Sequence, residues 1–203
     1  MKNLEKRISG LIIGSIFPLS LGLLSITIWV LFDKSESRPL IYLTIGLLLG
    51  LLIDLKFLKR WINRRFDLPI WVVISIYIVY NVFVYGFFMG FPVFNAFLGL
   101  LAGCYYGHRI CFNKVEPEKH AKLINQVALL AGLIMTLVCI SSGFLVLMDF
   151  GAAGMIKEIL GLDFEVTNSM MWGIVLTGGL ALIFINIILT RIAMIKTIKN
   201  CVR

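Results

Sequence analysis

The sequence predicts an all-α, polytopic membrane protein built as a bundle of six transmembrane helices. Two observations carry this prediction: 60% of the 203 residues are hydrophobic, and only 15% are charged. A soluble domain has about half apolar and about a quarter charged residues. The charges also cluster, which leaves runs of about 20 nearly uncharged residues, long enough to cross a bilayer as helices. We therefore expect a single integral membrane domain over residues 1–203.

Six apolar runs give the predicted spans in order. They cover residues 8–32, 40–58, 68–89, 91–112, 123–148 and 169–190. The sequence Gly-Phe-Pro at residues 90–92 predicts a tight turn, so we expect the third and fourth spans to form an antiparallel hairpin. Residues 151–167 form the longest connection, and their apolar periodicity predicts a short helix at the membrane surface.

Lysines and arginines are distributed unequally between the two predicted sides of the membrane. If the N-terminus is cytoplasmic, the opposite side receives only Lys34, Arg38 and Lys157. The positive-inside rule therefore predicts that both termini are cytoplasmic and that the protein lies in the cell (cytoplasmic) membrane. Loop topology accounts for the net charge of +8. The expected partner is the lipid bilayer, and no nucleic acid is needed to explain the charge.

Small residues recur at four-residue intervals in two spans. They are Gly46 and Gly50 in the second span and Gly99, Gly103 and Gly107 in the fourth. Asn95 lies one step before the glycines of the fourth span. Residues four apart share one side of a helix, and small residues let membrane helices approach closely. We predict that these glycines are helix-packing positions, which also leaves room for a membrane-protein partner or a homo-oligomer.

A stripe of polar side chains is the first candidate ligand site. Tyr77, Asn81 and Tyr85 follow one another at four-residue steps in the third span, and Asn95 lies in its predicted hairpin partner. These residues could line a polar cavity for a solute or an ion. The alternative, which the sequence favours, is that they fasten neighbouring helices through hydrogen bonds of roughly 0.6–2 kcal/mol each.

Asp54 is the only acid well inside a predicted span boundary. A carboxylate at membrane depth is a candidate cation or proton site. Lys56 follows two residues later and a basic run begins at once, which places Asp54 near the cytoplasmic interface. Pairing with Lys59 or Arg60 is therefore the favoured interpretation.

Three residues of the fourth span have metal-ligand chemistry. Cys104, His108 and Cys111 share one helix face, and thiolate and imidazole both bind zinc or copper. A rigid helix spreads the two sulfurs along its axis, however, so that they could hardly reach one ion. We expect packing cysteines beside a histidine that faces the headgroups, and no metal.

No enzyme motif is visible, and the sequence predicts neither a catalytic residue nor a cofactor. Ser141 and Ser142 lack the flanking pattern of a catalytic nucleophile. The functional hypothesis is a protein that transports or binds a small solute or ion, alone or as a membrane subunit. The alternative is an accessory or assembly subunit of a larger membrane complex. An intramembrane enzyme acting on lipid is disfavoured because no charged catalytic cluster is present.

Overall fold

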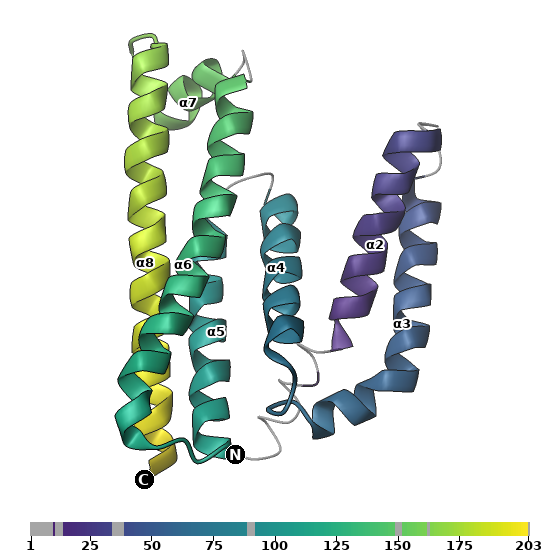
Figure 1. The fold of residues 1–203 in the computed structure, drawn as a ribbon. Coiled ribbons are helices and arrows are strands. Elements are labelled where there is room, and N and C mark those ends of the chain that lie inside the picture. The colour runs from purple at the N-terminus through teal and green to yellow at the C-terminus, as the bar shows by residue number, and fades with distance from the viewer. Residues whose placement is uncertain are drawn as a thin grey trace. The chain divides into compact units, whose positions relative to one another are not determined.

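The structure, a computed structural model, is all-helical over the residues that it describes, which are 10, 14–33, 39–88, 92–148, 152–161 and 163–202 (Figure 1). No strand occurs in these ranges. Four helices are long and apolar enough to cross a membrane. They are α3 (Pro39–Asn63), α4 (Ile70–Phe87), α6 (Pro117–Met148) and α8 (Asn168–Val202).

The other described helices are shorter or less apolar. They are α2 (Ile16–Ile28), which continues as the π-helical segment η1 (Trp29–Asp33), α5 (Val93–Phe112) and α7 (Ala152–Leu160). Asparagine, glycine, histidine and arginine lower the hydropathy of α5, although its length suits a span. The helix α7 forms where a short helix is expected. Of the predicted turn at residues 90–92, only Pro92 lies within the described part of the chain.

The chain forms two compact units, one over Met1–Phe83 and the other over Val84–Arg203. In the first unit α2 and α3 lie side by side (Figure 1). A Cβ atom added to Gly46 would overlap Ser25, and one added to Gly50 would overlap the backbone of Pro18. Higher numbers on α3 thus meet lower numbers on α2, so the two helices are antiparallel.

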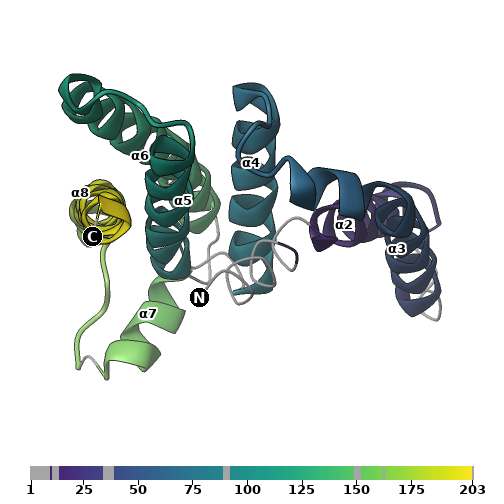
Figure 2. The same cartoon turned by 90° about the horizontal axis from the view of Figure 1, so that it is seen from below.

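The second unit is organised around α8, which packs along both α5 and α6 (Figure 2). An added Cβ atom on Gly132 would lie 2.7 Å from Ile187, and one on Gly143 would lie 2.6 Å from Val175, so α6 and α8 are antiparallel. Successive glycines of α5 meet residues with successively higher numbers on α8, from Gly99 beside Asn186 to Gly107 beside Thr197, so these two helices are parallel. Three helices therefore share one core.

Two clusters of buried apolar side chains hold this second unit together. One contains Ala96, Met135 and Cys139, and the other contains Ile110, Val127, Met194 and Ile198. Large apolar side chains on the outer faces remain exposed, including Leu129, Leu133 and Ile140 of α6 and Leu180, Phe184 and Ile188 of α8. Continuous apolar surface of this kind suits a lipid environment.

Two helices extend further than their apolar runs. The span predicted to end at residue 190 continues as α8 to Val202, and the span predicted to begin at residue 123 begins at Pro117. In the extension of α8, Ala193, Met194 and Ile198 are buried while lysines alternate with them. Basic residues end an apolar run, but they do not end a helix whose remaining face is packed.

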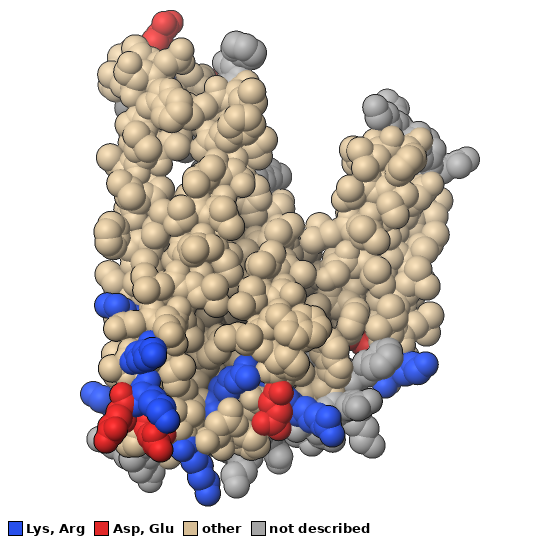
Figure 3. Space-filling view, viewed as in Figure 1, with Lys and Arg blue, Asp and Glu red and all other residues tan. Residues whose placement is uncertain are grey.

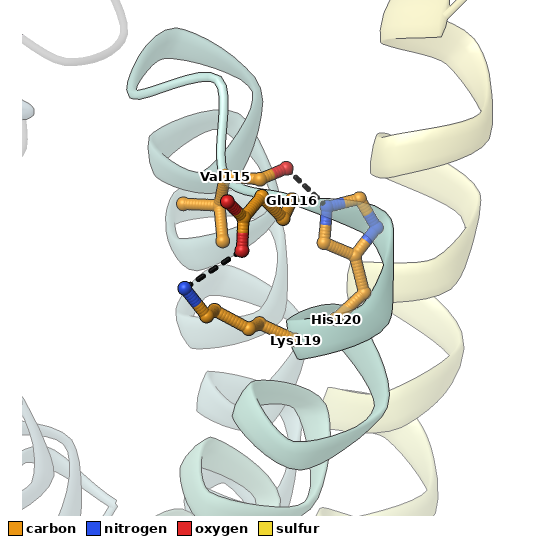
Figure 4. Close-up of polar contacts among 4 residues, drawn as sticks. All are labelled: Val115, Glu116, Lys119 and His120. Atoms are coloured by element: carbon orange, nitrogen blue, oxygen red, sulfur yellow. Dashed lines mark hydrogen bonds and ion pairs between the residues drawn. The ribbon is translucent and has the colours of Figure 1, made fainter.

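The turn between α5 and α6 has a defined geometry (Figure 4). Lys114 adopts a left-handed conformation with a φ of 48°. The Lys114 N–H donates to Cys111 O, and the Val115 N–H donates to Ile110 O, both over 3.2 Å. This is a Schellman cap, and Val115 also packs against the cluster of Ile110. His120 Nε2 lies 2.9 Å from Val115 O, which joins the start of α6 to the same turn.

Candidate functional site

Asp54 lies on the packed side of α3 in the first unit. It follows Gly46 and Gly50 at four-residue steps, on the side that faces α2. The residue is 5% exposed, and α3 continues for more than two turns beyond it, to Asn63. Within the described part of the chain, its Oδ2 atom is buried and has no hydrogen-bond partner. Asp54 is therefore inside the helix packing and well before the end of the helix.

Two hydroxyl groups belong to the neighbourhood of this carboxylate. Ser15 Oγ and the Tyr80 phenol are hydrogen-bonded to each other, although 65 residues separate them. Tyr80 also lies within electrostatic range of Asp54. Ser15 precedes α2, Asp54 is on α3 and Tyr80 is on α4, so three segments each contribute one polar group. We call these three residues the Asp54 cluster.

Burial sets the chemistry of the Asp54 cluster. An isolated carboxylate that leaves water costs several kcal/mol of free energy unless a proton or a cation neutralises it. Serine and tyrosine hydroxyls can donate to a carboxylate, or can accept from a protonated acid or coordinate a cation. The side chains of Lys59 and Arg60, the partners expected from the sequence, lie outside the described residues.

The residues of the predicted polar stripe are divided between the two units, with Tyr77 and Asn81 in the first and Tyr85 and Asn95 in the second. Tyr77, Asn81 and Tyr85 share a face of α4, and Asn81 is only 1% exposed. The Asn81 Nδ2 donates over 2.9 Å to Tyr77 O, on its own helix. Tyr77 and Tyr85 are half-buried. Asn95 belongs to the second unit, where its described contact is with α8.

Asn95 and its partner form a buried polar contact between α5 and α8. Asn95, Asn186 and Thr190 are all fully buried. The Asn186 Nδ2 donates to the backbone carbonyls of Asn95, over 3.4 Å, and of Ala96, over 3.1 Å. The Thr190 hydroxyl donates to Asn186 O over 2.8 Å. The two bonds from Asn186 fasten the beginning of α5 to the middle of α8, whereas the Thr190 bond lies within α8.

The glycines of α5 form the groove that receives α8. A Cβ atom on Gly99 would lie 2.7 Å from Thr190 Oγ1, and one on Gly107 would lie 2.7 Å from Thr197 Cβ. A Cβ atom on Gly103 would overlap the Thr190 backbone carbonyl. Any side chain at these positions would push the helices apart, so glycine permits the approach. The glycines of both stripes are thus occupied by helices of this same chain.

Basic side chains of the second unit gather at one end (Figure 3). This is the end at which α5 and α8 finish and α6 begins, and its basic residues are Arg109, Lys114, Lys119, Lys122, Lys196 and Lys199. Lys119 pairs with Glu116 over 2.7 Å, but both side chains are exposed, so the pair adds little stability. At the other end, the described residues between α6 and α8 include one lysine, Lys157, and three acids.

One of the candidate metal residues of α5, His108, has a backbone partner. His108 Nδ1 lies 2.8 Å from the carbonyl oxygen of Cys104, one turn earlier on the same helix. Among the described residues, no group of three or more histidine, cysteine, aspartate or glutamate side chains could hold a metal ion.

No family model matches the chain. Searches of curated proteins and of solved structures also return no match. A functional proposal must therefore rest on the residues of this chain.

Several residues of these sites are missing from the sequence-based candidates. These are Ser15, Tyr80 and Thr190. Asn186, Thr190 and Thr197 lie at four- and seven-residue steps, which is a helical stripe. That stripe is visible in the sequence, but the helix that it faces is not.

Proposed function

We propose that this chain is a small integral membrane protein that binds and moves a proton or a small cation, alone or as a membrane subunit, with Asp54 as the binding group. One observation carries the proposal. Asp54 is nearly completely buried on a helix long enough and apolar enough to cross a membrane, and its Oδ2 has no hydrogen-bond partner among the described residues. Ionisable residues in such positions commonly mark ion pathways and proton relays.

The composition of the Asp54 cluster favours a hard, oxygen-preferring ligand. A carboxylate and two hydroxyls offer oxygen atoms only, which suit a proton or a cation such as sodium and not a soft metal. Within the predicted polar stripe, the Asn81 amide donates to its own helix, and the backbone carbonyl of Asn95 accepts from Asn186 on α8.

The proposed topology has six spans with both termini on the cytoplasmic side of the cell membrane. The segment ending in η1 would be the first span and α5 the fourth, in addition to the four long helices. The glycine stripe of α5 faces α8, so the low hydropathy of this helix does not oppose a membrane position. The cluster of lysines and arginines where α5 and α8 end supports a cytoplasmic location for that end.

The accessory or assembly role is the second candidate. It depends on glycine-rich faces that are free to bind other subunits. Since the glycines of α3 contact α2 and those of α5 contact α8, these faces are not available for another protein. The binding of a proton or a small cation therefore has the stronger support.

Flux measurements on reconstituted protein test the proposal. Proteoliposomes containing the parent protein, Asp54→Asn or the control Asp67→Asn would be compared with a pH-sensitive dye and with radiolabelled sodium and rubidium. Asp67 is an exposed acid just beyond α3. Asparagine can neither release a proton nor carry the negative charge that would hold a cation, so we expect Asp54→Asn to lower the flux about tenfold or more, which corresponds to a loss of about 1.4 kcal/mol of binding free energy.

The control decides how a loss of flux is interpreted. Asp67→Asn should retain the parent flux, and Asp54→Asn should keep the parent elution volume and thermal stability. Parent-level flux of all three species through Asp54→Asn would overturn the proposal. So would the absence of flux of any of them through the parent protein.

A further inference from the structure

The packed faces of α5 and α8 each contain a cysteine near the end of the helix. Gly107 packs against Thr197 in the interface between the two helices. Four residues beyond Gly107 is Cys111, and four residues beyond Thr197 is Cys201. Because α5 and α8 are parallel, these steps bring the two cysteines together, and their thiols lie close enough to interact.

The two cysteines differ in exposure. Cys201 is exposed near the end of α8, whereas Cys111 is half-buried against the cluster of Ile110. The turn after α5 holds Cys111 in place, since its carbonyl accepts from the Lys114 N–H. An exposed thiol therefore lies beside a second thiol on a rigid helix.

The other two cysteines provide an internal comparison. Cys104 is exposed on α5, two turns before Cys111. Cys139 is buried, and its thiol donates weakly to the Gly179 carbonyl over 3.8 Å. All four cysteines are free thiols, so any selective chemistry at one pair is open to measurement.

We propose that Cys111 and Cys201 form a reversible disulfide that ties the end of α5 to the end of α8 when a disulfide oxidant of the glutathione class is present. This assignment does not depend on the function of Asp54. It makes the basic end of the second unit a redox-sensitive site.

The reaction consists of two thiol–disulfide exchanges. The Cys201 thiolate attacks one sulfur of glutathione disulfide, the S–S bond of that molecule breaks, and one glutathione leaves. The Cys111 thiolate then attacks the Cys201 sulfur and releases the second glutathione. Two protein thiols are oxidised, glutathione disulfide is reduced by two electrons, and the two thiol protons end on the two glutathione molecules.

In the orientation proposed above, this end of the unit faces the cytoplasm. Cytoplasmic thiols are kept reduced, and disulfides that form there are usually transient and redox-sensing. The pair is then a dithiol at rest and closes when the proportion of glutathione disulfide rises. Closure fixes the end of an interface that glycine packing already holds at Gly99, Gly103 and Gly107.

Differential alkylation tests this inference on the whole protein. The detergent-purified protein would be equilibrated in glutathione buffers of increasing oxidation and alkylated with one isotope form of N-ethylmaleimide. It would then be reduced and alkylated with a second form, and each cysteine would be quantified by mass spectrometry. We expect that, as the buffer becomes more oxidising, Cys111 and Cys201 together take up the second form of N-ethylmaleimide, which labels only after reduction. Cys104 should take up the first form in every buffer.

Serine variants separate the two roles. In Cys111→Ser, Cys201 should accumulate as a mixed disulfide with glutathione because the second exchange is lost. In Cys201→Ser, Cys111 should stay reduced. The matched control Cys104→Ser should leave oxidation of the pair unchanged.

Three results would overturn the assignment. The first is a parent protein in which Cys201 carries glutathione while Cys111 stays free. The second is a disulfide that joins two copies of the chain. The third is protection of both thiols that a chelator removes without a reductant, which would indicate a bound soft metal ion instead.

Discussion

The glycine stripes of α3 and α5 begin alike and end differently. In each, glycines four residues apart let a neighbouring helix approach to backbone contact, α2 in the first unit and α8 in the second. One step beyond Gly50 the stripe of α3 reaches the carboxylate of Asp54, whereas one step beyond Gly103 the stripe of α5 reaches another glycine. Packing by glycines thus buries an ionisable group in one unit and closes a neutral interface in the other.

In our proposal, this difference separates a site for ligand binding, at Asp54, from a site for helix association. The buried amide of Asn186 on α8 donates to backbone carbonyls of α5, and that use is structural. A buried carboxylate stabilises a fold poorly, because desolvation offsets the attraction of its partner. This is the reason why we propose exchange of a proton or a cation at Asp54 and not a packing role.

The largest expected effect on stability comes from filling the grooves. In Gly50→Ala and in Gly103→Ala, the added Cβ atom overlaps the backbone of the facing helix. Overpacking of this kind costs about 1–3 kcal/mol of unfolding free energy. Thermal unfolding in detergent measures the loss, and Gly178→Ala is the control because no atom lies within 4 Å of its added Cβ. Equal stability of Gly103→Ala and Gly178→Ala would show that the groove is not closely packed.

The next effect is a loss of stability without a loss of flux, which we expect for a substitution in the second unit. Asn186→Leu removes the hydrogen bonds to Asn95 O and Ala96 O, so we expect a loss of about 0.6–2 kcal/mol of stability. Flux per folded molecule should not change. Asn200→Leu, at an exposed position on the same helix, should alter neither quantity. A large loss of flux in Asn186→Leu at parent stability would move the functional site to the second unit.

A smaller effect is expected at the edge of the Asp54 cluster. Tyr80→Phe removes the hydroxyl that is bonded to Ser15. A neutral hydrogen bond contributes about 0.5–1.5 kcal/mol, so flux should fall roughly two- to tenfold. The same flux assay measures this, with Tyr85→Phe on the same helix as the control. If both variants retain full flux, the Tyr80 hydroxyl takes no part in ligand binding.

The smallest effect is expected at Asn81. Its amide donates to the carbonyl of Tyr77 on its own helix, one turn earlier. Asn81→Leu should therefore lower the unfolding free energy by less than about 1 kcal/mol, as thermal unfolding would show. A loss comparable with that of Asn186→Leu would indicate that Asn81 fastens α4 to another segment.

Much of the helical architecture is predictable because bilayer-spanning length and apolar composition are local properties of the sequence. The all-helical fold and the four long apolar helices follow from them. The helix ends are less predictable, since hydropathy stops at the first basic residues while packing continues. Met194 and Ile198 stay buried beyond Arg191, and they extend α8 to Val202.

The candidate sites depend on contacts between segments that are distant in the chain. The sequence shows the glycine stripe of α5, but not that Asn186 and Thr190 fill it. In the same way, Lys56 beside Asp54 suggests a position near the cytoplasmic interface, but it does not show that Asp54 is buried or that α3 continues for more than two turns beyond it, to Asn63. The four-residue steps from Gly46 to Asp54 predict that Asp54 shares the packed face of its helix. Whether Asp54 is buried depends on which helix covers that face, and the sequence does not show this.

Carbodiimide labelling tests the central claim most directly, because a hydrophobic carbodiimide modifies protonated carboxyl groups in apolar surroundings. The protein in lipid vesicles would be treated with dicyclohexylcarbodiimide, with and without sodium or potassium and at two pH values, and the modified residue identified by peptide mass spectrometry. Our account predicts modification of Asp54 but not of the exposed Asp67. It further predicts that raising the pH or adding a bound cation protects Asp54. An Asp54 that stays unmodified under every condition would be permanently paired, and that result would contradict the assignment of Asp54 as an exchangeable site.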